Sequence, residues 1–218
     1  MRRNPRLGEA LERLRLAERE AIGVDRMFID MLADGHPVPS IVEDATRVMV
    51  TLNGDLVDDS WVAMVSDLKP PERRGDVNSL LLLNRLRSQR WVDIATAAAT
   101  IQRTEGEAET ALAHLEGAVR GSTGALLVIA HPLPRRVRVW TPGPGMGAVL
   151  PGLEPEDRER IAMDYAEANG AVTSTIAMTI TGVTRPTATA DLARLEAAGD
   201  LLRRGAGPTA HFTMPQTP

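Results

Sequence analysis

The chain contains no cysteine among its 218 residues. Disulfide bonds, thiol catalysis and cysteine-ligated zinc are therefore excluded, and the composition fits a reducing compartment. Aromatic residues make up only 3% of the sequence, so its cores must consist of aliphatic side chains and methionine. The longest apolar runs, residues 80–83 and 125–130, are far too short to cross a bilayer, and the charged N-terminus shows no signal peptide. We therefore expect a cytoplasmic protein without membrane contact.

Lysine is almost absent, since only Lys69 among the 25 basic residues is a lysine, and the net charge is −4. The bias toward arginine, together with the many alanines, is typical of a GC-rich genome and does not by itself indicate nucleic-acid binding. Proteins that are held to DNA by their overall field are basic. If this chain binds DNA, it must do so through local patches.

No arrangement typical of an active site is present. The histidines lie far apart without metal-ligand spacing, and neither a nucleophile-elbow motif nor a zinc-protease motif occurs; the histidines are His36, His114, His131 and His211. The carboxylates are spread over expected exposed helix faces beside arginines. The sequence therefore predicts a protein that is not an enzyme and has neither metal nor cofactor.

The strongest local pattern lies near the C-terminus. Residues 174–181 are predicted to form a short helix capped by Thr173 or Ser174, and Gly182 follows where a tight turn needs a positive φ. Thr184 is the expected N-cap of the next helix, whose first turn tolerates Pro186.

That second helix has one apolar face, because Ala188, Leu192 and Leu195 follow helical spacing, and Gly199 ends it. Two short strands, residues 201–204 and 211–214, are predicted to flank a glycine-rich turn. Two helices followed by such a hairpin form a winged helix-turn-helix.

A helix of this length fits the major groove, and its first turn points toward base edges and phosphates. The expected DNA-binding residues are therefore the polar and basic side chains of this helix and of the hairpin's start. They are Thr184, Arg185, Thr187, Thr189, Arg194, Arg203 and Arg204.

The segment 182–205 reads G-V-T-R-P-T-A-T-A-D-L-x-x-L-x-x-x-G-x-L-x-R-x-G, and it resembles the C-terminal winged helices of many bacterial regulators. Those helices usually open with S-R-P-T-A-T-R-D-L, and their wings usually end in an Arg-Tyr pair. Here Thr184 replaces the serine, Ala190 replaces the second arginine, and His211 and Phe212 stand in the wing. The resemblance implies DNA binding with fewer phosphate contacts than usual.

The N-terminal part is predicted to begin with two helices over residues 4–34, interrupted at Gly23. An alternating strand over 47–52 and a helix over 55–68 follow. The pieces R-N-P-x-L-x-E-A-L, G-V-D-R-M and R-V-x-V-T-L resemble the RecG C-terminal-like region of AlbA/Schlafen-type bacterial transcriptional regulators, over about residues 2–52. In that family an ATP-binding, DNA-binding domain precedes this region and winged helices follow it. The chain is therefore expected to be a fragment or a shortened relative.

The middle of the chain predicts a second winged helix over residues 76–140, after a proline-rich linker at 70–75. Its third helix carries only acidic charges, at Glu105, Glu107, Glu109 and Glu116, and phosphates would repel it. We therefore expect a packing or dimerising module. Its hairpin holds the basic cluster Arg135, Arg136 and Arg138, which is either a possible DNA-backbone contact or a solvated turn.

The glycine-rich stretch 141–155 lacks the Gly-Lys-Ser/Thr signature of a phosphate-binding loop and is predicted to be a linker. The last domain, 156–218, opens with a helix whose Ile161, Tyr165 and Ala168 are expected to face inward.

The sequence as a whole predicts an α+β, mostly helical chain: an α/β segment at 1–69 followed by two winged helix-turn-helix domains. The predicted function is a DNA-binding transcriptional regulator that reads double-stranded DNA through its C-terminal domain, acting as a homodimer because two half-sites multiply weak binding. Two alternatives stay open: a protein-interaction module that does not bind DNA, and an accessory fragment of an ATP-dependent nucleic-acid enzyme.

Overall fold

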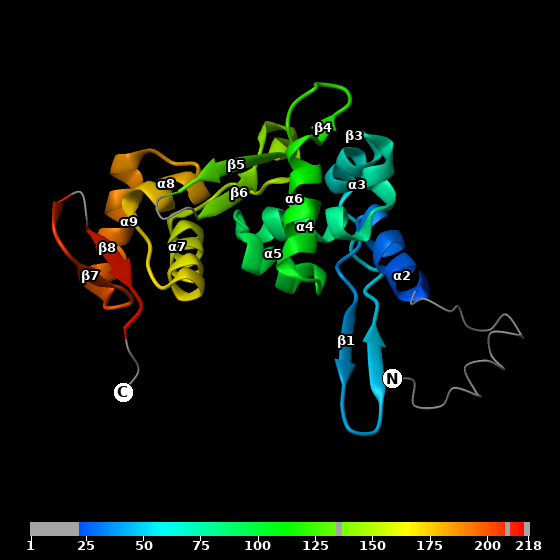
Figure 1. The fold of residues 1–218 in the computed structure, drawn as a ribbon, viewed down its shortest axis with the longest axis horizontal. Helices are drawn as coiled ribbons and strands as arrows, with labels where there is room; N and C mark the ends of the chain where they lie inside the picture. The colour runs from blue at the N-terminus through cyan, green and yellow to red at the C-terminus, as the bar shows by residue number, and fades with distance from the viewer. Residues whose placement is uncertain (1–21, 134–136, 208–209, 216–218) are drawn as a thin grey trace, which may run out of the picture. The chain divides into compact units, whose positions relative to one another are not determined.

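The computed structural model describes residues 22–133, 137–207 and 210–215. Within these ranges the chain is α+β and mostly helical, as predicted, and its short strands pair two at a time (Figure 1). The chain divides into two compact units, residues 1–81 and 82–218, and each is described by itself. No helix in the described part of the chain is both long and apolar enough to cross a lipid bilayer.

The first unit contains the helices α2 (Ile22–Ala33) and α3 (Asp59–Ser66). Leu32 and Trp61 are almost fully buried, and the Trp61 indole N–H donates a 2.6 Å hydrogen bond to the Leu32 carbonyl. Asp58 caps α3 by accepting a 3.0 Å bond from the Trp61 backbone N–H, so this helix begins four residues later than predicted. Helix α2 runs through Gly23, where the sequence predicted a break, and the helix predicted before residue 22 lies outside the described residues.

A hairpin of β1 (Ser40–Glu43) and β2 (Val48–Thr51) extends away from α2 and α3 in Figure 1. The sequence predicted only its second strand. Asp44 closes the turn by accepting backbone N–H bonds from Thr46 at 2.8 Å and from Arg47 at 3.0 Å. The bonds from Thr46, and then those from Arg47, lower the pKa of Asp44 to about 2. All residues of both strands are exposed.

The proline-rich stretch predicted as a linker is instead an ordered part of the first unit. Strand β3 (Leu68–Lys69) precedes it, the stretch itself forms the 3₁₀ helix η1 (Pro71–Gly75), and Arg74 Nε donates a 3.2 Å bond to the carbonyl of the first β3 residue. Asp76 then accepts two backbone N–H bonds and caps α4 (Val77–Gln89). The boundary between the two units falls within α4.

The second unit continues from α4 with two helices and a hairpin. Asp93 and Thr104 cap the two helices through their side chains, and Thr104 forms a reciprocal capping box with Glu107. The first of these helices begins only after Val92, because the Val92 N–H and carbonyl pair with Trp140 at 3.0 and 2.8 Å. The elements are α5 (Ile94–Ile101), α6 (Glu105–Glu116), β4 (Val119–Arg120), β5 (Val128–Pro132) and β6 (Arg138–Pro142).

The glycine-rich stretch 141–155 is not the free linker that the sequence predicted. Strand β6 runs into it, and the 3₁₀ helix η3 (Pro144–Val149) buries Met146 against the unit. The Gly143 N–H donates a 2.7 Å bond to the Leu127 carbonyl, and a Cβ at Gly143 would lie 2.4 Å from the Leu126 carbonyl oxygen. Glycine is needed here because the two backbones lie in direct contact.

Gly143→Ala is therefore expected to destabilise the protein by about 1–3 kcal/mol, because a methyl group must push two backbones apart. Urea unfolding followed by circular dichroism measures the change. Gly147→Ala is the matched control, since nothing lies within 4 Å of a Cβ built there. Equal stabilities of the two variants would contradict the tight contact at Gly143.

The last part of the chain follows the sequence prediction closely. The helices are α7 (Pro155–Asn169), α8 (Ser174–Thr181) and α9 (Arg185–Ala198), and the hairpin is β7 (Leu202–Arg204) with β8 (His211–Thr213). Ala188, Leu192 and Leu195 are buried as predicted. Ala168 is exposed, contrary to prediction, because the buried stripe of α7 consists of Ile161, Ala162, Tyr165 and Ala166.

The two helical bundles of the second unit share one hydrophobic core. Trp91 and Val139, from the bundle that contains α5 and α6, belong to the same buried cluster as Tyr165 and Leu192. The rings of Trp91 and Tyr165 meet edge-on, with their centroids 4.8 Å apart. Aromatic side chains therefore belong to a core that the composition predicted to be aliphatic. The segment between the bundles is therefore a packed connection.

Candidate nucleic-acid interface

Helices α8 and α9 meet at a tight turn that sets the angle between them. Thr173 Oγ1 caps α8 by accepting a 3.2 Å bond from the Ile176 N–H. Gly182, at φ 72°, ends α8 in the left-handed conformation, and its N–H bonds the Met178 carbonyl at 2.9 Å. The cap and the turn predicted from sequence are both present.

A groove of about 350 Å³ lies between the start of α8, one face of α9 and the β7–β8 hairpin. Its lining combines hydroxyl groups with two arginines and one carboxylate. These polar lining residues are Thr173, Ser174, Thr175, Arg185, Thr189, Glu196 and Arg203. The predicted site residues Arg185, Thr189 and Arg203 are thus brought together.

Arg185 is the first residue of α9, and its side chain is exposed. One of its terminal nitrogens, Nη2, donates a 3.0 Å hydrogen bond to Thr175 Oγ1 on α8. The guanidinium therefore stands at the positive end of the helix dipole, where an approaching anion or base edge can reach it.

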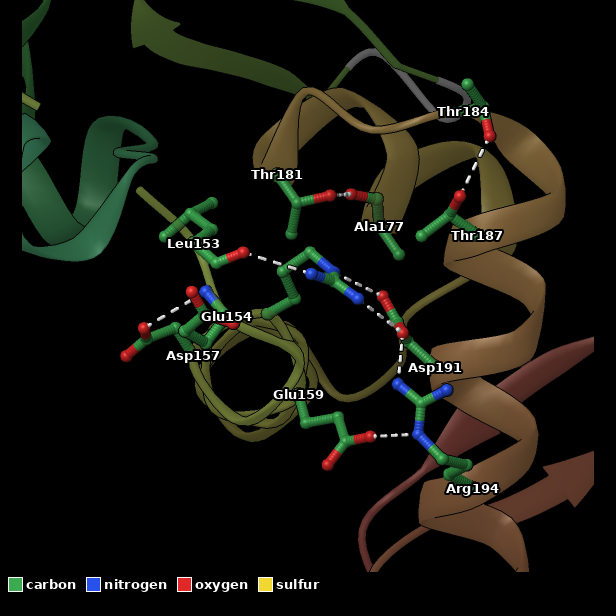
Figure 2. Close-up of polar contacts among 11 residues, drawn as sticks. Leu153, Glu154, Asp157, Glu159, Ala177, Thr181, Thr184, Thr187, Asp191 and Arg194 are labelled. Atoms are coloured by element: carbon green, nitrogen blue, oxygen red, sulfur yellow. Dashed lines mark hydrogen bonds and ion pairs between the residues drawn. The ribbon is translucent and has the colours of Figure 1, made fainter. Parts of the chain in front are cut away.

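The two threonines at the start of α9 bond each other instead of the helix backbone. Thr184 occupies the N-cap position, but its side chain accepts no backbone N–H. Its hydroxyl lies 2.9 Å from the Thr187 hydroxyl, as Figure 2 shows. The Thr184 side chain therefore leaves the backbone N–H groups in the first turn of α9 available to another acceptor, such as a phosphate oxygen.

Arg203 and Arg204 lie on β7, and both are exposed. They pair in the hairpin with Phe212 and His211. Because side chains alternate along a strand, the two arginines point to opposite faces of the hairpin, and Arg203 is the one that lines the groove.

Arg194 belongs to an ion-pair network that joins α9 to α7 (Figure 2). Its guanidinium bonds Glu159 at 2.6 Å and also bonds Asp191. The Asp191 carboxylate also accepts two hydrogen bonds from Arg158, one from Nε at 2.8 Å and one from Nη2 at 3.1 Å. The structure thus places Arg194 in contacts within the bundle, whereas the sequence analysis expected it to contact DNA.

Asp191 is the least exposed member of this network, with 5% of its side chain accessible. Burial raises its pKa, but the hydrogen bonds and charges of Arg158 and Arg194 outweigh burial and hold the pKa of Asp191 below its ordinary value. The hydrogen bond to Asp191 correspondingly raises the pKa of Arg158. Asp191 is therefore a buried, compensated charge and adds little repulsion at the surface.

Sequence reasoning missed this network, although one signal was present. Asp191 lies beside Leu192 on the stripe of α9 that also contains Ala188, so a carboxylate at that position needed a buried partner. Its main partner, Arg158, lies 33 residues earlier in the chain, and no local spacing connects the two.

The β5–β6 hairpin contributes to packing. Val139 belongs to the core that is shared with the last bundle, and Leu133 and Val137 pack against that core. Arg138 is exposed, lies 3.8 Å from Glu116 and stacks over the Trp140 ring at 5.6 Å. Arg135 and Arg136, the other residues of the predicted backbone contact, lie outside the described residues.

The described residues contain no group of three or more histidine, aspartate or glutamate side chains that could hold a metal ion. On α6, Glu105, Glu107 and Glu109 are exposed, so this face is acidic in the structure as it is in the sequence.

Comparison with known proteins finds similarity to a protein family and to solved structures. Residues 1–52 match the family described as "Putative ATP-dependent DNA helicase recG C-terminal", which confirms the RecG-like resemblance of this part. The chain is also similar to the crystal structure of the DIP2311 protein from Corynebacterium diphtheriae, with a TM-score of 0.81 and 24% identity. That match covers 99% of this chain and 40% of the other, so the chain spans two fifths of that protein's length. No curated protein matches the chain.

Proposed function

We propose that the chain is a DNA-binding transcriptional regulator whose last bundle, α7–α9 with β7–β8, is a winged helix-turn-helix. The observation that carries this proposal is the exposed guanidinium of Arg185 at the start of α9, beside a groove that Arg203 also lines. Base edges in the major groove are read by side chains in this position, and a wing arginine meets the backbone.

The exposed face of α9 supports a close approach to DNA. Pro186, Ala190, Ala193 and Ala197 are exposed and small, so the helix can lie deep in a groove. Alanine side chains also make apolar contact with thymine methyl groups. The only carboxylate among the groove-lining residues is Glu196, which lies beyond the first turns of α9.

The first bundle of the second unit serves as support in this proposal. Its α6 presents acidic side chains, and its β5–β6 hairpin is packed against the core of the last bundle. A single chain would place one helix in the major groove and make few phosphate contacts, so it binds weakly. A homodimer on two half-sites multiplies that affinity.

Arg185→Ala is expected to weaken duplex binding by about 1–3 kcal/mol, because Arg185 is the basic side chain best placed to meet a base. Fluorescence anisotropy at fixed salt, on a duplex selected by the wild-type protein, measures the loss. Arg160→Ala is the control, because this substitution removes the same charge elsewhere. Arg160 is an exposed arginine of α7 that pairs with Asp157 and Asp164. Equal affinities of the two variants would remove Arg185 from the interface.

A second candidate function is protein interaction without DNA binding, and the β1–β2 hairpin favours it. Ile41, Val42, Val48, Met49 and Val50 are each between 45% and 61% exposed, and they occupy both faces of the hairpin. Exposed apolar surface of this kind marks contact with another protein. Duplex selection separates the two functions, because an interaction module enriches no sequence.

A third candidate is an accessory fragment of an ATP-dependent nucleic-acid enzyme, which the description of the N-terminal family favours. Measured affinity for ATP in the absence of DNA would support it. Absence of such affinity would leave the regulator as the better proposal.

A further inference from the structure

The contact between Arg185 and Thr175 joins two helices that are separated by the turn at Gly182. The Arg185 Nη2 donates to the Thr175 hydroxyl at 3.0 Å, and both residues line the groove beside α9. An arginine side chain is long and flexible, and it loses conformational freedom when a ligand fixes it. A hydrogen bond that holds it beforehand reduces this loss.

The Thr175 hydroxyl is itself held in place by a rigid helix. Thr175 lies in the first turn of α8, whose N-cap is Thr173, and its carbonyl accepts a 2.9 Å bond from the Thr179 hydroxyl. Ala177 and Ile180 anchor the other side of this helix in the core. The acceptor that meets Arg185 is therefore fixed independently of any ligand.

We infer that Thr175 is a positioning residue that presents Arg185 for bidentate recognition of guanine. This inference rests on the proposed function and names the base that the site reads. A guanidinium has five N–H donors, and the bond to Thr175 occupies one of them, which leaves parallel donors for guanine O6 and N7.

Two features favour a base edge over a phosphate as the target of Arg185. A phosphate accepts hydrogen bonds from many directions and gains little from an oriented fork, whereas the paired acceptors of guanine require one. The carboxylate of Glu196 also lines the groove, and it disfavours a phosphate drawn into the same space.

The test uses the full-length chain and a random duplex library, from which the wild-type protein selects its preferred site. Anisotropy titrations then compare the selected duplex with one in which a single G·C pair is replaced by A·T. Thr175→Val removes the hydroxyl at nearly constant volume, and it is expected to lower the wild-type preference for guanine about three- to tenfold. Thr175→Ser keeps a hydroxyl and is expected to restore the preference.

Two further measurements separate positioning from a structural effect. The salt dependence of binding and the thermal midpoint are expected to stay the same in Thr175→Val, because Thr175 contacts no phosphate in this proposal. In an Arg185→Ala background, Thr175→Val is expected to change nothing further, since its effect passes through Arg185.

The possible failures have different signatures. A Thr175→Val protein that keeps the full guanine preference, or that loses affinity equally for both duplexes, overturns the role of Thr175 and leaves the proposed function intact. A wild-type protein that selects no duplex overturns the proposed function, and the inference falls with it.

Discussion

Replacing Asp191 by alanine is expected to lower the free energy of unfolding by about 3 kcal/mol, near the lower end of the range for a broken buried ion pair. The loss arises because Arg158, whose side chain is only 13% exposed, keeps its charge when its main partner is removed. One contact remains to it, since Arg158 Nη1 also donates to the Leu153 carbonyl at 3.0 Å. Urea unfolding followed by circular dichroism measures the change.

Glu159→Ala is the matched control for this experiment. Glu159 is also an acid that pairs with Arg194, but half of the Arg194 side chain is exposed to water, so that pair contributes about 0–1 kcal/mol. A loss of stability in Asp191→Ala no larger than in Glu159→Ala would contradict the buried Arg158–Asp191 ion pair between α7 and α9.

The pH dependence of stability provides a second measurement of the Arg158–Asp191 ion pair. The pKa of Asp191 is lowered in the folded protein, so its contribution is present above the ordinary aspartate pKa and is lost as the pH falls through the lower folded value. The wild-type protein should therefore lose more stability than Asp191→Ala between neutral and strongly acidic pH. Parallel curves for the two proteins would show that the carboxylate is not paired.

Trp91→Ala is expected to destabilise the second unit by about 3–5 kcal/mol, the range for removing a large buried aromatic side chain. Trp91 is fully buried, and it packs on Tyr165 in the core that joins the two bundles. Because this core joins the bundles, its loss should also separate their unfolding. Calorimetry is expected to show one transition for this unit in the wild type and two in the variant.

Tyr165 reports the same change spectroscopically. Burial, and then the charge of Asp93, raises its pKa to about 12. Opening the core at Trp91 is expected to move that pKa down toward the ordinary tyrosine value, which absorbance titration detects. Trp91→Phe is the control, since the Trp91 indole N–H has no hydrogen-bond partner in the described part of the chain and phenylalanine keeps most of the ring contact. An unchanged Tyr165 titration in Trp91→Ala would contradict the shared core.

The elements that the sequence predicted best are those whose signals lie within a few residues. Helix α8 has the predicted bounds because a threonine cap precedes it and Gly182 follows it. Helix α9 begins after Thr184 and ends before Gly199 for the same kind of reason. The buried face of α9 followed from spacing alone, since Leu192 and Leu195 share one side of the helix.

The features that the sequence did not reveal depend on contacts between distant residues. The segment around Gly143 has the composition of a linker, but it packs against the backbone of Leu126 and Leu127, about 17 residues earlier in the chain. The sequence predicted Asp191 to be a surface charge, whereas in the structure it is paired with Arg158. The site residues Arg185 and Arg203 are near each other for a similar reason, because the hairpin folds back along α9, and their contact with DNA stays a prediction.

The contact at Gly143 also has a consequence for how proteins of this fold can diverge in length. An insertion between Gly143 and Met146 would displace a backbone that lies directly against residues 125–127, and it would carry buried Met146 out of register. The turn at residues 121–124 is exposed throughout and can absorb extra residues without moving the core. Gaps in alignments of related chains are therefore expected to collect in that turn, while the segment joining the bundles keeps a constant length.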